Sequence, residues 1–229
     1  MRVSPPATEA TARAPAIDIR PRWRGVIHRW AAPIGIALFV PLIARAETAG
    51  VRIALVVYAA GMTAMLGVSA IYHSGKLTPL AARRMKRVDH STILVAIAGT
   101  YTAVTTLALD GTARVAMLVA IWVAAVVGVA VRMVWLDAPY PVSAGVYLVA
   151  GWLVLADLPG YVRGLSGAQL ALLIAGGTFY TVGGVVYALH RPNPWPLVFG
   201  YHEVFHALVV LGALCHYACV FGLTDAART

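Results

Sequence analysis

The sequence predicts an all-α integral membrane protein, a seven-transmembrane helix bundle with its N-terminus in the cytoplasm and its C-terminus outside. Of the 229 residues, 60% are hydrophobic and only 12% are charged, and the mean hydropathy is +0.79. Soluble domains carry about 25% charged residues, roughly twice that share. Apolar stretches close to the roughly 20 residues that a helix needs to cross a bilayer recur along the whole chain.

Seven such stretches follow one another, at residues 26–45, 51–73, 89–109, 113–136, 140–157, 167–189 and 200–222. The first is needed because, without it, the basic N-terminal tail and the basic loop 74–88 would lie on opposite sides of the membrane. We expect one transmembrane domain, 26–222. The tail 1–25, rich in Ala, Pro, Thr and Arg, is predicted to be disordered, and 223–229 is a short external tail.

Basic residues set the predicted orientation. Thirteen of the 18 Lys and Arg residues fall in the N-terminal tail or in loops on the same side of the membrane. Cytoplasmic loops carry such an excess, so we place the N-terminus in the cytoplasm. The net charge of +9 then reflects topology and attraction to anionic lipid. Because this charge flanks helices, we expect no nucleic-acid partner.

Polar residues from three predicted helices share one depth, near the cytoplasmic face. His73 ends the second helix, Asp89 begins the third, and His202 and His206 lie in the first turns of the seventh. Residues four apart project from the same side of a helix, as His202 and His206 do, and Ser69 stands at that spacing before His73. Ionisable groups within a membrane are costly and are usually functional. The pattern therefore indicates one site.

The order of these residues resembles the hemolysin III family, through Ser-x3-His, an Asp 16 residues later and a terminal His-x3-His. That family belongs with the adiponectin and progestin receptors and, more distantly, with the alkaline ceramidases. The resemblance covers about residues 26 to 222 and implies seven helices and a cytoplasmic N-terminus. In the receptors, the three histidines bind zinc and the aspartate holds the metal-bound water. The resemblance therefore implies zinc as cofactor, with His73, His202 and His206 as ligands and Asp89 as the water partner.

This set of residues is also chemically suited to catalysis. Three neutral imidazoles and a water give zinc a tetrahedral shell with one exchangeable position, as in catalytic sites. Asp89 would orient the water and pass a proton to a leaving amine, and Ser69 would hydrogen-bond to substrate or to the surrounding groups. A site near the lipid headgroups suits hydrolysis of a lipid amide. We expect membrane lipids as partners and a location in a bacterial inner (plasma) membrane.

The segment HEVFH, residues 202–206, also matches the zinc-protease pattern H-E-x-x-H. Intramembrane zinc proteases need a further acidic ligand, and Asp110 lies at the other end of the third helix, about 30 Å away. Glu203 is rotated about 100° from His202 on the helix. We interpret the match as coincidental.

Three other functions stay open from the sequence: a lipid-modifying role in membrane homeostasis, a receptor or sensor in which zinc only ties the second, third and seventh helices together, and a lytic pore. The pore is disfavoured because no polar helix face runs through the bundle. Among the other histidines, we expect His28 to be structural and His90 to lie at the surface beside the basic loop. His216, about 15 Å beyond His206 along the helix, is too distant to join the site.

Overall fold

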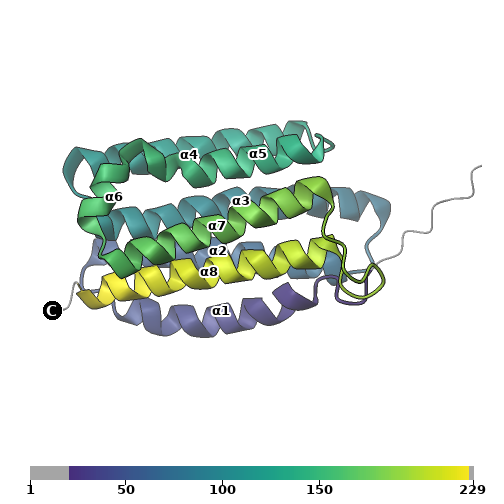
Figure 1. Ribbon diagram of the computed structural model, residues 1–229, viewed down its shortest axis with the longest axis horizontal. Helices are drawn as coiled ribbons and strands as arrows, with labels where there is room; N and C mark the ends of the chain where they lie inside the picture. Colours follow the sequence, from purple (N-terminus) through teal and green to yellow (C-terminus); the bar gives the residue numbers. More distant parts are fainter. Residues whose placement is uncertain (1–20, 227–229) are drawn as a thin grey trace, which may run out of the picture.

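The computed structural model describes residues 21–226, which form a bundle of long, roughly parallel and antiparallel helices (Figure 1). Seven helical spans are long and apolar enough to cross a membrane, and no β-strand is present among the described residues. This confirms the predicted seven-helix, all-α fold. The spans are α1 (Val26–Ala44), α2 (Ala49–Ser74), α3 (Pro79–Ala108), α4 (Gly111–Val134), a composite fifth span (Tyr140–Gly164), α7 (Gly167–Leu189) and α8 (Tyr201–Ala226).

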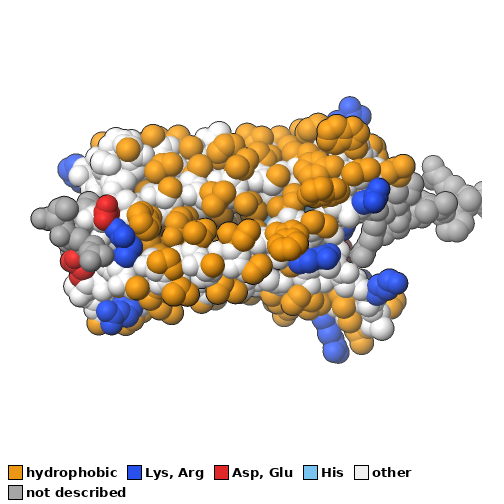
Figure 2. Space-filling view, turned by 90° about the horizontal axis from the view of Figure 1, so that it is seen from below, with side chains coloured by type: hydrophobic (Ala, Val, Ile, Leu, Met, Phe, Trp, Pro, Cys, Tyr) orange, Lys and Arg blue, Asp and Glu red, His pale blue; other side chains and the backbone are white. Residues whose placement is uncertain are grey.

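The outer surface is that of a protein surrounded by lipid. Figure 2 shows hydrophobic side chains covering the length of the bundle, with Lys, Arg, Asp and Glu confined to its two ends. Large aliphatic side chains point outward from several helices, including Val40, Ile53, Val126, Val134 and Val149, all more than 60% exposed. Monomeric soluble proteins rarely expose an apolar surface of this extent. The chain is a multi-pass integral membrane protein.

Helix α3 begins at Pro79, ten residues earlier than the sequence predicted. The Thr78 side chain accepts a hydrogen bond from the Ala81 amide at its N-terminus, and proline occupies its first position, where its missing N–H costs nothing. The predicted loop 74–88 was wrong because Arg, Lys, Leu and Ala are good helix formers. Asp89 therefore lies well inside α3 and does not begin it.

The basic first turns of α3 are tied to the loop that follows α4. Lys86 donates a hydrogen bond to Asp137 over 3.3 Å, and Arg83 lies 3.4 Å from the same carboxylate. This hydrogen bond and the positive charges of Lys86, Arg83 and Arg87 hold the pKa of Asp137 below its ordinary value.

The fifth span is not the single helix predicted at 140–157. It comprises α5 (Tyr140–Gly151), a 3₁₀ segment η1 (Trp152–Asp157) and the short helix α6 (Leu158–Gly164). At the break, the Tyr101 hydroxyl donates to the Gly151 carbonyl and accepts from the Val154 amide, both over 2.7 Å. Backbone groups released within a membrane need such partners, so Tyr101 stabilises the change of helix type.

Close helix contacts fix the position of the polar end of the bundle. Helix α2 packs against α3, and α7 packs against α8. At the first contact, a Cβ at Gly61 would lie 2.9 Å from the Val95 carbonyl oxygen, and one at Gly99 would lie 3.0 Å from that of Val57. Small residues that let backbones approach are typical of membrane helix pairs. The result is a closely packed α2–α3 pair carrying His73 and Asp89.

Buried residues differ in kind between the two ends of the bundle. Apolar and aromatic side chains such as Leu42, Leu55 and Tyr58 fill the interior toward the far end. At the end where α1 and α8 begin, which we call the N-terminal end, the buried side chains are largely polar: His28, Ser69, His73, Asp89, His202, Glu203 and His206. The candidate site lies here.

Candidate metal centre and its cavity

Three histidines converge at the N-terminal end of the bundle. His73 comes from the last turn of α2, and His202 and His206 come from the first two turns of α8. One nitrogen of each lies within 4.8 Å of the others, and the Nε2 atoms of His73 and His202 are 3.2 Å apart. Two nitrogens bound to one tetrahedral zinc ion would be separated by about 3.3 Å. The three buried side chains fit a single metal ion.

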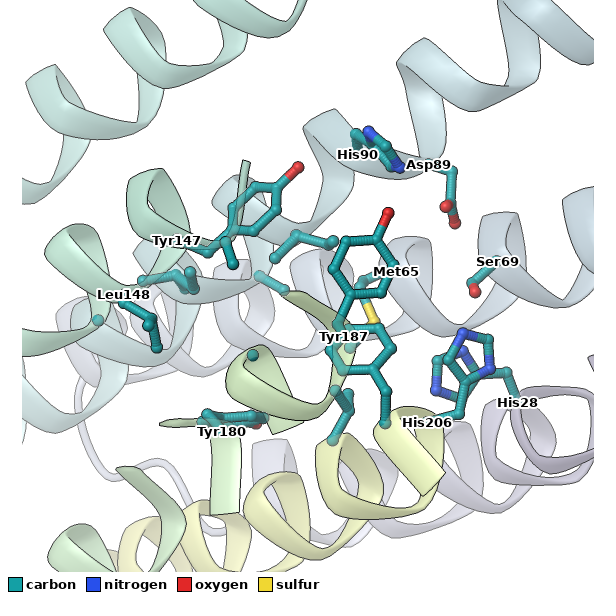
Figure 3. Close-up of a pocket in the computed structure, with 18 of the residues that line it drawn as sticks. His28, Met65, Ser69, Asp89, His90, Tyr147, Leu148, Tyr180, Tyr187 and His206 are labelled. Carbon is teal, nitrogen blue, oxygen red and sulfur yellow. The ribbon is translucent and has the colours of Figure 1, made fainter. Parts of the chain in front are cut away.

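Asp89 and Ser69 lie beside this cluster. The Asp89 Oδ2 atom is 3.9 Å from the His73 Nε2 atom, and both side chains are buried. Ser69, one turn before His73 on α2, faces the Asp89 carboxyl (Figure 3). The structure thus brings together all five residues that the sequence singled out, although their roles in binding and catalysis stay predictions.

A fourth histidine, His28, belongs to the same cluster, although the sequence predicted only a structural role for it. The ring of His28, in the first turn of α1, stacks on that of His206 with centroids 4.0 Å apart and planes 1° from parallel. Only 2% of His28 is exposed. The signal was available, because His28 is an ionisable residue at the same depth as the others. Its contact with His206 could not be read from the sequence, since it depends on how α1 docks.

Glu203 does not face the metal-binding nitrogens. Its Oε2 atom accepts a hydrogen bond from the Gly200 amide over 2.8 Å, and its Oε1 atom lies 2.7 Å from the Arg24 Nε atom. A glutamate that reaches back to the first backbone N–H of its own helix forms half of a capping box. These contacts account for the glutamate in HEVFH without a catalytic role.

The residues just before α1 are fastened to the same corner. The amides of Arg22 and Trp23 donate to the carbonyls of Leu197 and Val198 in the loop between α7 and α8. These residues lie in the segment that we assigned to the disordered tail; its residues 1–20 fall outside the described part of the chain. Together with the Arg24–Glu203 ion pair, these hydrogen bonds hold α1 against the start of α8.

A cavity of about 470 Å³ extends from the histidine cluster into the bundle. Its polar end holds the five predicted site residues and His28, and its walls come from α2, α3, α5, α7 and α8. Apolar and aromatic residues line it further in, among them Met65, Ile97, Leu148 and Tyr180. Its inner end reaches His216, whose Nε2 atom hydrogen-bonds to the Leu173 carbonyl. This volume is within the range of ligand pockets, about 300–1,000 Å³.

His90 also lines the cavity, so its expected place at the surface was wrong. Its Nδ1 atom is hydrogen-bonded to Arg132, a side chain of α4 that is only 1% exposed. Figure 3 shows His90 next to Asp89 at the edge of the pocket. An arginine in an otherwise apolar membrane helix was the signal that the sequence offered. His90 lies inside the bundle because α3 presents this residue toward α4.

Comparison with known proteins agrees with this architecture. A family model described as "Haemolysin-III related" matches residues 19–217. The chain is 35% identical over 133 residues to the hemolysin-3 homolog of Bacillus subtilis (strain 168), a match that covers 58% of this chain and 60% of that protein. It is 28% identical over 198 residues to hemolysin-3 of Bacillus cereus, covering 85% and 87%.

A more distant similarity reaches animal proteins. The chain is 33% identical over 88 residues to the adiponectin receptor protein of Drosophila melanogaster, which covers 34% of this chain and 20% of that receptor. The family model spans most of the chain, including α1 to α7 and the histidines of α8. The chain therefore belongs to the hemolysin III family of membrane proteins, which has adiponectin-receptor-like relatives.

Proposed function

We propose that this protein is a zinc-dependent hydrolase of lipid amides in a bacterial inner membrane, with its N-terminus in the cytoplasm. The observation that carries the proposal is the position of the three-histidine cluster. It lies at the polar end of a cavity of about 470 Å³, with a buried carboxyl group 3.9 Å from one of the histidine nitrogens. A cluster with a purely structural role would not need so large a cavity beside it.

The donor set favours zinc among the common metals. Imidazole nitrogen is a borderline ligand that suits zinc, and three protein ligands leave one position for water or substrate. When bound, zinc supplies a water whose pKa is lowered toward 7 and polarises a carbonyl group. His73, His202 and His206 would hold the ion.

Asp89 would move the proton. Its Oδ2 atom is the carboxylate oxygen nearest His73, so it can accept a proton from the attacking water and deliver it to the leaving amine nitrogen. Ser69, facing Asp89 from α2 (Figure 3), would fix the rotamer of that carboxyl group. Over the whole reaction the amide C–N bond breaks, a C–O bond forms, and a fatty acid and an amine leave.

The shape of the cavity supports a lipid substrate. Its inner end at His216 is ten residues beyond His206 on α8, a distance of about 15 Å along the helix. An acyl chain would lie along Ile97, Leu148 and Tyr180, with its carbonyl carbon at the histidines. Membrane lipids are therefore the proposed partners, and no soluble partner is needed for this reaction.

Release of free fatty acid from C18 ceramide by the detergent-purified, zinc-loaded protein tests the proposal. We expect Asp89→Ala to stop release while it retains zinc. The control Asp110→Ala removes an exposed carboxyl group at the opposite end of α3 and should leave release unchanged. Zinc-loaded wild-type protein that releases no fatty acid from ceramide or other N-acyl lipids would refute the hydrolase. A loss of thermal stability on chelation would then indicate a structural metal, and conductance in liposomes would indicate a pore.

A further inference from the structure

Arg132 is a buried cation that the proposed reaction does not yet use. It lies in α4, is only 1% exposed, and takes part in none of the ion pairs formed by the described residues. Its guanidinium donates hydrogen bonds to the Ser143 hydroxyl over 2.8 Å and to the Leu136 carbonyl over 3.0 Å. Its remaining strong contact is with the Nδ1 atom of His90. A buried charge is costly, so its placement beside a cavity histidine calls for a reason.

The hydrogen bond between these two side chains fixes the tautomer of His90. A guanidinium group has five N–H donors and no acceptor, so the Nδ1 atom of His90 must accept. A neutral imidazole carries one proton, and with Nδ1 as acceptor that proton resides on Nε2. Arg132 therefore turns the other ring nitrogen of His90 into a hydrogen-bond donor.

That donor is free to meet a ligand. The Nε2 atom of His90 forms no hydrogen bond among the contacts of the described residues, while the side chain lines the cavity directly after Asp89 in α3. Figure 3 shows His90 between Asp89 and Tyr147, on the α3–α5 side of the pocket, with His206 and His28 across from it. A carbonyl group held between the histidine cluster and this wall would have the N–H of His90 as a neighbour.

We propose that His90 donates its Nε2–H to the carbonyl oxygen of the lipid amide and that Arg132 is the positioning residue that keeps the proton on that nitrogen. This inference rests on the proposed hydrolase function for its substrate. The carbonyl oxygen gains negative charge as water adds to the carbonyl carbon, and a preorganised donor stabilises that charge. No proton leaves His90 in this step; the proton of the attacking water goes to the amine through Asp89.

Kinetics of zinc-loaded variants with C18 ceramide test the role of His90. Removal of one such donor lowers turnover by about 10²–10³-fold, so we expect His90→Phe to lower kcat/KM by that factor at unchanged zinc content. Asp110→Ala, which removes an exposed side chain outside the cavity, serves as the control and should stay within a few-fold of wild type. A His90→Phe variant that keeps zinc and full turnover would overturn the proposal.

Nitrogen-15 NMR of histidine-labelled protein tests the tautomer without any turnover. We expect a protonated Nε2 and an unprotonated Nδ1 for His90 in the wild type, a mixture of tautomers in Arg132→Met, and a shift of the His90 Nε2 signal when C18 ceramide is added. A protonated Nδ1 in the wild type would overturn the proposal. The wild-type spectra alone decide the tautomer of His90, so the test remains possible if His90→Phe does not fold.

Ceramide binding separates this inference from the hydrolase itself. If zinc-loaded wild type binds C18 ceramide but does not turn it over, the proposed function fails. The role of His90 then stands provided that His90→Phe binds about tenfold more weakly, as expected for loss of one hydrogen bond. Equal affinity of wild type and His90→Phe, or no binding to wild type, would refute it.

Discussion

The ion pair between Arg24 and Glu203 gives a prediction that distinguishes a structural role of Glu203 from a role as catalytic base in the HEVFH segment. Glu203 is 1% exposed and Arg24 is 22% exposed, with 2.7 Å between the Oε1 and Nε atoms. In Glu203→Gln, the amide oxygen can still accept from the Gly200 N–H, but the charge on the Arg24 side is lost. The ion pair is therefore lost, and the hydrogen bond from the Gly200 amide becomes one to a neutral acceptor; hydrogen bonds to charged groups contribute about 1.5–3 kcal/mol. Because Arg24 is partly solvated, we expect a loss near the lower limit, about 1.5–2 kcal/mol.

Arg24→Ala should be more harmful, because it leaves the Glu203 carboxylate buried without its cation. Breaking a buried pair in this way costs about 3–5 kcal/mol, and the remaining Gly200 N–H keeps the expected loss near 3 kcal/mol. For a chain of this size, 1 kcal/mol corresponds to about 2–4 °C in Tm. We therefore expect Tm to fall by about 3–8 °C in Glu203→Gln and by about 6–12 °C in Arg24→Ala. In the double variant, the two losses should be less than additive.

The assay is thermal unfolding of the detergent-purified variants, followed by tryptophan fluorescence, together with zinc content and ceramide hydrolysis. We expect Glu203→Gln to lose stability while it retains zinc and turnover. The opposite result, an unchanged Tm with zinc retained and turnover abolished, would show that Glu203 acts as a catalytic base and would refute the structural role argued from its contacts.

Three further outcomes follow from the structure. Gly25 has a φ of +78°, and a Cβ there would lie 2.7 Å from the Ser74 hydroxyl oxygen; Gly25→Ala should therefore cost about 1–3 kcal/mol, measured by thermal unfolding, and release zinc to a chelator faster than wild type. The hydrogen bond from Lys86 and the neighbouring charges lower the pKa of Asp137 from 3.8, so these contacts stabilise the fold above that pH and are lost below it. When the pH is lowered from about 7 to about 3, the Tm of Asp137→Asn should therefore fall less than the Tm of the wild type. An equal fall in both proteins would contradict this. Zinc bound at 100 times its Kd contributes about 2.7 kcal/mol, or about 5–11 °C; a chelator should remove this from wild type and leave the Tm of His202→Ala/His206→Ala unchanged.

The sequence was sufficient for the helix count and for the convergence of the predicted site residues. Apolar length reveals each span, and residues at equal depth in neighbouring helices meet if the bundle is compact. His73 and His202, 129 residues apart in sequence, could be brought together by this reasoning alone. Depth is a one-dimensional quantity, however, and a helix can present a residue at the right depth to lipid, to a neighbour or to a cavity.

The features that escaped prediction all depend on helix rotation or on local backbone chemistry. His28 and His90 stand at the depth of the site, but only the packing of α1 and α4 shows that one stacks on His206 and the other meets Arg132. The early start of α3 escaped prediction because its basic residues are charged enough to be typical of a loop, although their intrinsic helix propensity is high. The break after Gly151 is stabilised by Tyr101, a residue 50 positions away, which no local pattern reveals.

Metal content is the measurement that tests the central claim most directly. Inductively coupled plasma mass spectrometry of the detergent-purified wild type, beside His202→Ala/His206→Ala, would count the bound ions. We predict close to one zinc per chain in the wild type and its loss in the double variant. No metal in either protein, even after reloading with zinc, would contradict both the catalytic and the structural zinc and leave the buried histidine cluster without its proposed occupant.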